Sequence, residues 1–482
     1  MSDSQSPHAT DVEEQLEVLR SSLTVQVPYT GGVYPVKVED LVIYYDAEGE
    51  NGPRRIDLGK ATEKDLAELT AACQKATFGV GGADVLDESY RKAGKMDIER
   101  FAARFDVSGL LETVAPEILQ GQNTDEDKFL KPELYKLNVY GPGSFFKAHK
   151  DTPRSEDMIG SLVVVFPTIH SGGALTLEHN GKSWVFDSAA EVAAASHTPS
   201  LAYVAFYSDV THAVEPVQTG YRVTLTYNLF LADRRTTTGH GKRHVSGPEQ
   251  AFEGALRTLL DSPTFLPAGG FLAYGLTHQY PLPAPAKPEW DAVNRKFAMP
   301  PSRLGSVLRL LKGSDARIRT ISERVGLSTH VKVLYESVSE DSYDIEDVVA
   351  KGTDVLADDV LNMDHVYDDG DFGLKRAMEE MGLVVQQRPE RTEELRKAYE
   401  AYRKQWPNDV EDEYLKGADG NAGELVPMHW VTKITDLNRV NSSYIAYGNE
   451  AQIQYVYGNA ALFVQVPPIA EGIRALTAGK AE

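Results

Sequence analysis

Six short β-rich stretches follow one another between Leu134 and Leu231, each bounded by a turn that contains Gly, Ser, Asp or Pro. They read LYKLNVY, SLVVVFPTI, GALTLEH, KSWVFD, LAYVAFY and RVTLTYNLFL. The connections carry no helical periodicity, and this density of short strands is typical of a barrel or a jelly roll. The middle of the chain is therefore predicted to be an all-β domain.

The flanking regions mix helical and strand patterns. Apolar residues at helical spacing among acids predict a short amphipathic helix over 11–23, and Thr62 followed by Asp65 predicts a capped helix. Further helices are expected near 302–312 and 392–404, among strand-like pieces. We expect a disordered tail at 1–10, a domain over 11–232 with its core at 132–231, a polar linker at 233–250 and a mixed α/β accessory domain over 251–482.

Length and charge narrow the classes of function. A chain of 482 residues exceeds the usual size of one compact core, so several domains are expected. Its net charge of −22 would repel phosphate backbones, so we expect no nucleic-acid partner. Cys73 is the only cysteine, which excludes an intramolecular disulfide and a cysteine-rich metal site. The acidic N-terminus and the lack of a long apolar run predict no signal peptide, no membrane contact and a cytoplasmic location.

A histidine and an aspartate two residues apart, His149 and Asp151, follow a glycine-flanked turn at 141–143. Residues two apart point to the same side of an extended strand, so the pair can converge on one metal ion. On its own the pair is weak evidence, because a surface turn leading into Pro153 gives the same pattern.

A second histidine and an arginine sharpen this pattern. His212 lies 61 residues after Asp151 and precedes a strand in which Arg222, Thr224 and Thr226 share one face. An arginine buried in such a strand needs an anionic partner. Two histidines and one carboxylate on a β scaffold are typical ligands of a non-haem Fe(II) site with open positions. The arginine would then hold a carboxylate of a co-substrate in a bidentate pair.

These motifs resemble the Fe(II)/2-oxoglutarate-dependent dioxygenases of the prolyl 4-hydroxylase type. The resemblance covers roughly a fifth of the chain, from about Pro132 to Leu231. It includes the strand entry SGGALTL and two longer patterns, Y-x-x-G-x-x-F-x-x-H-x-D and H-x-V-x-P-V-x-x-G-x-R. The matching residues are Tyr140, Gly143, Phe146, His149 and Asp151 in the first pattern, and His212, Val214, Pro216, Val217, Gly220 and Arg222 in the second.

The resemblance implies an α+β, mainly β fold with a double-stranded β-helix (jelly-roll) catalytic core and a helical flank. It implies that His149, Asp151 and His212 bind Fe(II), and that Arg222 pairs with the C5 carboxylate of 2-oxoglutarate. O₂ would be the second co-substrate, succinate and CO₂ the by-products, and ascorbate a further cofactor. Because Asp151 is retained, hydroxylation is favoured over halogenation.

Other residues are predicted around this centre. Tyr140 and Asn138 share one strand face and would contact the co-substrate or orient the substrate, although Tyr140 could instead only pack at the rim. Relatives often place a tyrosine on the strand corresponding to SLVVVFP, and here threonines would substitute for it. The remaining expected co-substrate contacts are Val214, Thr224 and Thr226; the expected substrate contacts are Arg91 and Arg154; and His170 and His179 are interpreted as surface or loop residues.

Three functions remain open on these grounds. The first is a dioxygenase that hydroxylates a C–H bond of a prolyl residue in a protein or of a small molecule. The second is a catalytically inactive jelly-roll scaffold, and the third a protein that uses another divalent ion without O₂ chemistry. A fold does not determine a substrate, and the sequence indicates neither the substrate nor the oligomeric state.

Overall fold

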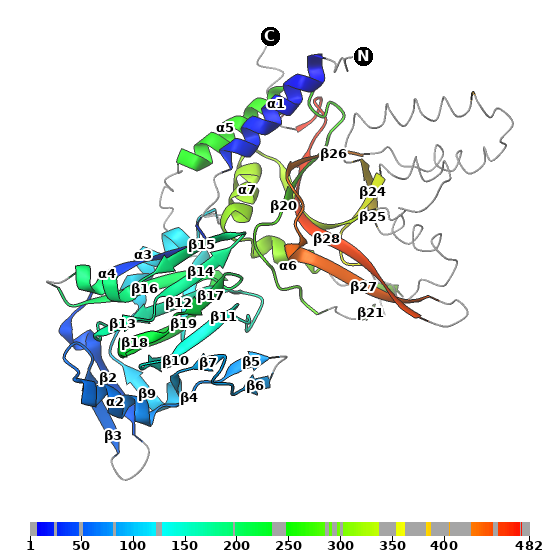
Figure 1. Cartoon of the computed structure of the whole chain (residues 1–482). Helices are drawn as coiled ribbons and strands as arrows, with labels where there is room; N and C mark the ends of the chain where they lie inside the picture. Colours follow the sequence, from blue (N-terminus) through cyan, green and yellow to red (C-terminus); the bar gives the residue numbers. More distant parts are fainter. Residues whose placement is uncertain are drawn as a thin grey trace. The chain divides into compact units, whose positions relative to one another are not determined.

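The computed structural model describes most of the chain. The described residues are 7–23, 27–47, 52–80, 83–121, 128–195, 198–233, 247–284, 289–291, 296–298, 302–336, 353–361, 382–386, 404, 426–446, 452–472 and 474. These residues form a mainly β protein with seven α-helices (Figure 1). The chain divides into two compact units, a central unit of residues 26–241 and a terminal unit of residues 1–25 and 242–482.

The central unit contains a large antiparallel sheet. Each of the six predicted β-rich stretches contributes a strand to this unit, which confirms the strand pattern. The spatial order of the large sheet is β1 (Tyr29–Pro35), β16 (Ser200–Tyr207), β12 (Met158–Val165), β19 (Arg222–Asp233), β10 (Lys128–Tyr140), β8 (Gly94–Asp97) and β4 (Gln74–Lys75).

A smaller antiparallel sheet supplies the histidines. Its order is β15 (Lys182–Phe186), β14 (Leu175–His179), β17 (Thr211–Val214), β11 (Phe145–His149) and β7 (Arg91–Lys92). Strands β13 (His170–Gly172) and β18 (Val217–Gly220) pair with each other as a separate two-stranded sheet. Side chains of the two sheets meet: the rings of Phe206 in the large sheet and His212 in the small sheet lie 4.5 Å apart.

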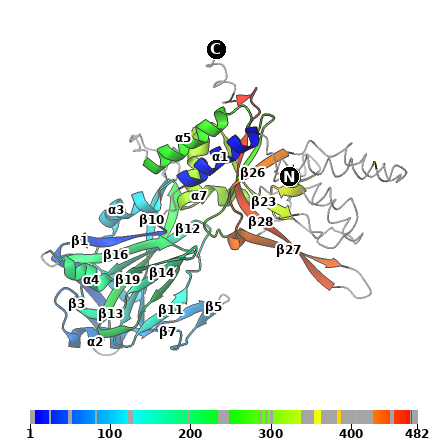
Figure 2. The same cartoon turned by 45° about the horizontal axis from the view of Figure 1, so that its top comes forward.

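Short elements flank these sheets. Helix α3 (Ser108–Ile118) packs against β1, β16 and β10, and α4 (Ser188–Ala194) packs against β16 and β1 (Figure 2). Helix α2 (Glu63–Ala72) begins with the predicted cap, in which Thr62 and Asp65 exchange side-chain and backbone hydrogen bonds. The remaining strands are β2 (Val42–Asp46), β3 (Pro53–Asp57), β9 (Phe101–Ala103), β5 (Phe78–Val80) and β6 (Ala83–Val85), with 3-10 turns at Val38–Leu41 and Ile98–Arg100.

Six strands of the terminal unit close into a ring. Strand β20 (Gly270–Gly275) pairs with both β26 (Val426–Thr432) and β28 (Gln452–Val466). The ring continues through β25 (Gly382–Gln386), β24 (Thr353–Ala357) and β23 (Ser328–Glu336), which pairs with β28. Strand β27 (Arg439–Ala446) pairs antiparallel with the N-terminal half of β28. Separately, β21 (Glu289–Asp291) pairs with β22 (Lys296–Ala298). A 3-10 turn spans Asp436–Asn438.

Helices cover this ring. One apolar cluster holds Phe271, Leu356, Met428 and Phe463 from ring strands, and a larger cluster joins the other strand face to helices. These helices are α1 (Pro7–Ser22), α5 (Gly247–Asp261), α6 (Leu304–Arg309), as predicted near 302–312, and α7 (Gly313–Arg324).

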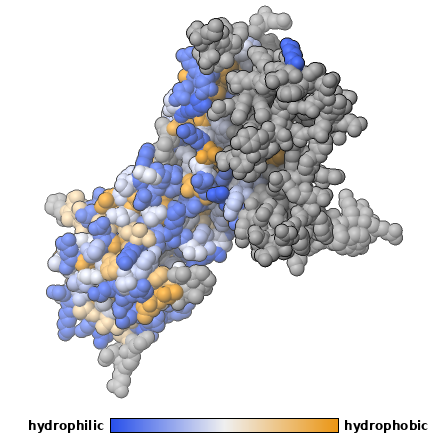
Figure 3. Space-filling model, turned by 45° about the vertical axis from the view of Figure 1, so that its right-hand side comes forward, coloured by the Kyte–Doolittle hydropathy of each residue, from blue (hydrophilic) through white to orange (hydrophobic). Residues whose placement is uncertain are grey.

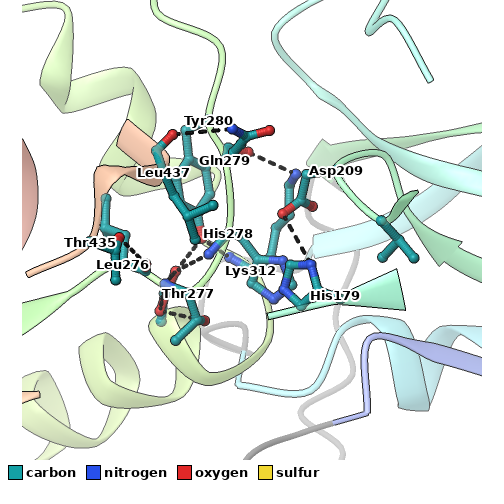
Figure 4. Close-up of polar contacts among 12 residues, drawn as sticks. His179, Asp209, Leu276, Thr277, His278, Gln279, Tyr280, Lys312, Thr435 and Leu437 are labelled. Carbon is teal, nitrogen blue, oxygen red and sulfur yellow. Dashed lines mark hydrogen bonds and ion pairs between the residues drawn. The ribbon is translucent and has the colours of Figure 1, made fainter. Parts of the chain in front are cut away.

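A buried aspartate ties one loop of this unit to α7. Asp315 is 1% exposed and accepts hydrogen bonds from the backbone and hydroxyl of Thr277 and from the hydroxyl of Tyr280. Lys312 donates to the carbonyl of Gln279 at 3.2 Å in the same loop (Figure 4). Burial raises the pKa of Asp315, and the donors around it oppose this rise.

The unit boundaries differ from the predicted domains at two points. Helix α1 begins at Pro7, so residues 7–10 of the predicted tail are helical, and it packs on α5 rather than on the central unit to which 11–25 were assigned. Helix α5 begins at Gly247, inside the predicted linker. Residues 1–6 of the tail, 234–246 of the linker and almost all of the predicted helix at 392–404 lie outside the described residues.

The described part of the surface is mainly hydrophilic (Figure 3). Hydrophilic residues dominate the described part of the face in Figure 3, and hydrophobic residues are scattered among them. Among the described helices, none has both the length and the apolar character needed to cross a membrane.

Candidate metal centre

His149, Asp151 and His212 come together between the two sheets of the central unit. His149 ends β11, His212 lies in register with it on β17, and Asp151 follows His149 by two residues. One ligand atom from each side chain lies within 4.8 Å of the others, and His212 Nε2 is 3.8 Å from Asp151 Oδ1. The predicted metal ligands therefore converge, as the H-x-D spacing and the distant histidine require.

Hydrogen bonds orient each ligand. Nδ1 of His149 lies 2.8 Å from the carbonyl of Lys147, and Nδ1 of His212 lies 3.1 Å from that of Val210. A carbonyl only accepts, so each Nδ1 must carry the proton, which leaves a lone pair on Nε2 for a metal. Asp151 Oδ2 accepts from Ser161 Oγ at 2.5 Å, so the carboxylate is also held in place.

Aromatic packing and burial keep the centre in a low-dielectric environment. Phe146 stacks on His149 with ring centroids 3.6 Å apart, and the His149 and His212 rings are 4.2 Å apart. Burial, and next the neighbouring His212, lower the pKa of His149 to about 3. His149 is therefore neutral at physiological pH, which is the state that binds a metal.

Arg222 has the unpaired buried charge that a co-substrate carboxylate would satisfy. Its side chain is 1% exposed, Nε lies 3.5 Å from Ser188 Oγ, and one terminal nitrogen has no partner. Burial lowers the pKa of Arg222, which expresses the cost of desolvating its charge. An anion beside this nitrogen would offset that cost.

A glycine makes room for this arginine. Gly173 has a φ of 72°, and a Cβ added there would lie 2.9 Å from Val217 Cγ2 and 3.1 Å from Arg222 Cδ. The SGGALTL stretch therefore needs glycine at this position both for the backbone conformation and for the space.

Four of the predicted co-substrate contacts, Tyr140, Asn138, Thr224 and Thr226, lie on the same face of the large sheet as Arg222. Tyr140 is in register with Arg222, and the guanidinium carbon lies 5.6 Å from the tyrosine ring centroid. Asn138 is in register with Thr224, which is 1% exposed. The Nδ2 atom of Asn138 donates a hydrogen bond to Thr226 Oγ1 at 3.1 Å. Val214 lies elsewhere, on β17 of the small sheet and in register with Phe146.

The two predicted substrate arginines differ in environment. Arg91 is 8% exposed, donates to Asn138 Oδ1 at 2.9 Å, and stacks on Phe146 with its guanidinium carbon 4.4 Å from the ring centroid. Arg91 thus lies behind the ring that supports His149. Arg154 is exposed and stacks on Tyr135.

Two histidines interpreted as surface residues are less exposed than expected. His170 Nδ1 lies 2.7 Å from the carbonyl of Thr168, and its Nε2 is buried without a partner. Burial lowers the pKa of His170, and the nearby charge of Arg222 lowers it further. His179 Nδ1 lies 3.9 Å from Asp209 Oδ2, and both side chains are buried (Figure 4). The glycine-rich turn beside His170 gave no sign of this burial, which results from the approach of β13 to Arg222.

Comparison with known proteins finds a family match for the segment that holds the triad. Residues 135–230 match the family model for the 2OG-Fe(II) oxygenase superfamily. No curated protein matches the chain.

Solved structures show similarity at low identity. A prolyl-4-hydroxylase from Pseudomonas putida is 15% identical over 45% of this chain and 99% of its own, with a TM-score of 0.27. A 2OG-Fe(II) oxygenase family oxidoreductase from Burkholderia pseudomallei is 17% identical over 49% and 98%, with a TM-score of 0.23. A Trichoplax adhaerens prolyl hydroxylase, solved with a hypoxia inducible factor peptide fragment, is 14% identical over 47% and 94%, with a TM-score of 0.26. At these TM-scores the likenesses add nothing on the substrate; the family match confirms the resemblance seen in the motifs over residues 135–230.

Proposed function

We propose that this protein is an Fe(II)- and 2-oxoglutarate-dependent dioxygenase that hydroxylates a C–H bond of a prolyl residue or a small molecule. The observation that carries the proposal is the prearranged triad, in which both histidines have Nδ1 committed to a carbonyl and Asp151 is held by Ser161. The two antiparallel sheets that enclose the triad support a double-stranded β-helix as its scaffold.

Each residue has a distinct part in this proposal. His149 and His212 would offer Nε2 and Asp151 Oδ1 to the metal, and Arg222 would bind the C5 carboxylate of 2-oxoglutarate with the nitrogen that now lacks a partner. When bound, Fe(II) and 2-oxoglutarate supply the O₂ chemistry that amino-acid side chains lack.

Aromatic side chains next to the triad would exclude water from it. Phe206 contacts the ring of His212, and Phe146 covers that of His149. We propose that the terminal unit, in which no second His/Asp metal set is formed by its own described residues, is an accessory domain.

An anaerobic titration of the Fe(II)-loaded protein with 2-oxoglutarate tests the proposal. Wild type should develop the visible metal-to-ligand charge-transfer band of an Fe(II)–2-oxoglutarate chelate. His149→Ala should abolish the band, and Arg222→Ala should raise the 2-oxoglutarate concentration at half-saturation by about 100-fold, since a charge-assisted bidentate pair is lost.

The alternatives predict other outcomes of that titration. A wild type that binds Fe(II) but shows no band would indicate a protein that uses a divalent ion without 2-oxoglutarate. A wild type that binds neither would contradict the enzyme and leave the inactive jelly-roll scaffold. Calorimetric titration with the metal alone separates these two results.

A further inference from the structure

A buried lysine on the inner face of the large sheet has no ionic partner among the described residues. Lys136 lies on β10 and is 8% exposed. Its ammonium nitrogen is not among the fully buried nitrogens that lack a hydrogen-bond partner, so solvent or a ligand can reach it.

The acids nearest to Lys136 along the strands are engaged elsewhere. Asp97 of β8 is in register with Lys136, but its carboxylate lies 3.6 Å from Lys95 Nζ. Glu133, on the same strand as Lys136, pairs with Lys131 at 2.7 Å and is half exposed. The positive charge of Lys136 is therefore not neutralised within this sheet.

Lys136 lies on the face that carries the metal centre. In the strand register Thr226 lies between Lys136 on one side and Val163 on the other. Ser161, two residues before Val163 and hence on the same face, donates to Asp151. Lys136 is thus two strands away from the residue that holds a metal ligand.

A second cation stands next to it, in the segment that follows Asp151. Arg154 and Lys136 both stack on Tyr135, with Cζ and Nζ lying 4.1 Å and 4.2 Å from the ring centroid. The pairing of β10 and β19 is irregular at Tyr135, between Leu134 and Lys136, so Tyr135 is the extra residue of a bulge. A cation–π contact orients a cation without neutralising it. Two positive charges therefore contact the same ring, one from the sheet face that carries Ser161 and one from the segment that follows Asp151.

We propose that Lys136 and Arg154 bind a carboxylate of the substrate, so that the enzyme selects an acidic substrate. The proposal rests on the proposed function and specifies its substrate class. The carboxylate could come from a free small acid or from an acidic side chain of a peptide, and both would form charge-assisted hydrogen bonds with the lysine and the guanidinium. The pair stands apart from Arg222, which lies four residues before Thr226 along β19 and would serve the co-substrate.

Binding of matched acid and amide probes tests this assignment. Calorimetric titrations of the anaerobic Fe(II)–2-oxoglutarate protein would compare N-acetyl-L-proline with N-acetyl-L-prolinamide. A second pair would be capped tetrapeptides in which glutamate or glutamine precedes proline. We expect at least one acid to bind about tenfold more tightly than its amide, as one charge-assisted hydrogen bond predicts. The pair that shows the preference identifies the source of the carboxylate.

Variants assign the preference to these residues. Lys136→Met keeps the apolar stem and should remove the preference, as should Arg154→Met at an exposed position where folding is not at risk. Lys131→Met is the matched control, because Lys131 is an exposed lysine on the same strand and should leave the preference unchanged. The assignment is overturned if wild type shows no acid preference with either pair, or if the preference survives in Arg154→Met and in a folded Lys136→Met.

The charge-transfer band separates this failure from that of the proposed function. A protein that shows the band but no acid preference would contradict only the carboxylate site. A protein without the band would contradict the dioxygenase itself.

Discussion

At the scale of single residues, the proposed metal centre depends on groups that would not touch the metal. The carbonyls of Lys147 and Val210 determine which nitrogen His149 and His212 can offer. Ser161 donates a hydrogen bond to Oδ2 of Asp151, which leaves Oδ1 as the oxygen that Asp151 can offer. Such supporting hydrogen bonds commonly change metal affinity by about 10- to 100-fold.

Ser161→Ala should therefore weaken metal binding while leaving the ligands in place. The variant frees Asp151 Oδ2, so the carboxylate can rotate away, and the dissociation constant for Fe(II) should rise about 10-fold or more. Anaerobic calorimetric titration measures this change. Ser155→Ala is the control, because Ser155 makes a similar 2.5 Å hydrogen bond to Asp157 at an exposed position. Equal Fe(II) affinity in the two variants would contradict a role for Ser161.

Gly173→Ala should separate backbone strain from crowding of the arginine. Gly173 and Gly181 have nearly the same φ, 72° and 71°, but only at Gly173 would a Cβ meet side chains, those of Val217 and Arg222. Gly181→Ala should cost about 1 kcal/mol of unfolding free energy from backbone strain alone. Gly173→Ala should cost more and also weaken 2-oxoglutarate binding. Denaturant unfolding and the charge-transfer titration measure the two effects, and unchanged 2-oxoglutarate binding would argue against the crowding.

At the scale of elements, local patterns predicted much of the central unit and little of the terminal one. The alternation in RVTLTYNLFL placed Arg222, Thr224 and Thr226 on one face, and the register of β19 with β10 brings Tyr140 and Asn138 opposite two of them. Successive side chains of a strand point to opposite faces of the sheet, so these faces follow from the sequence alone.

Sequence periodicity could not predict the contacts between elements that are far apart along the chain. The periodicity of α1 predicts an apolar stripe but not the surface that covers it. Arg20 of α1 donates to the carbonyls of Trp430 and Val431, more than 400 residues away in sequence. The closure of the terminal ring also depends on pairs such as β20 with β26, which are distant along the chain. In the same way, the charge of Lys136 stood out only once its strand neighbours were known.

Leu19→Ala should destabilise the terminal unit through α1. Leu19 is fully buried in the apolar cluster that joins α1 to α5, so its truncation should cost about 2–5 kcal/mol. Hydrogen exchange followed by mass spectrometry should show faster exchange in α5 and β26 and unchanged exchange in β11 and β17. Val18→Ala, at a position that is 54% exposed, is the control. Faster exchange confined to the central unit would contradict the assignment of α1.

At the scale of the whole molecule, one unit is inserted into the sequence of the other. Residues 26–241 form the central unit, and segments on both sides of them complete the terminal unit. Each unit has its own sheets and apolar side chains, so we expect each to unfold cooperatively.

Scanning calorimetry with ligands should reveal this division. Mn(II) and 2-oxoglutarate, each at about 100 times its dissociation constant, should stabilise the unit that binds them by about 2.7 kcal/mol per site. The transition of residues 26–241 should therefore move to higher temperature, while that of the terminal unit should not move. Asp151→Ala is the control and should remove the shift. A single transition that moves as a whole would contradict independent units.

The place of α1 also has a consequence for synthesis on the ribosome. Helix α1 leaves the ribosome before the central unit, yet α5, on which it packs, begins 225 residues after α1 ends. Domains generally fold as they emerge, so the intervening central unit has time to fold while the apolar stripe of α1 is still uncovered. During that interval α1 is exposed to chaperones and to neighbouring nascent chains, and the terminal unit can assemble only after β28 has been synthesised.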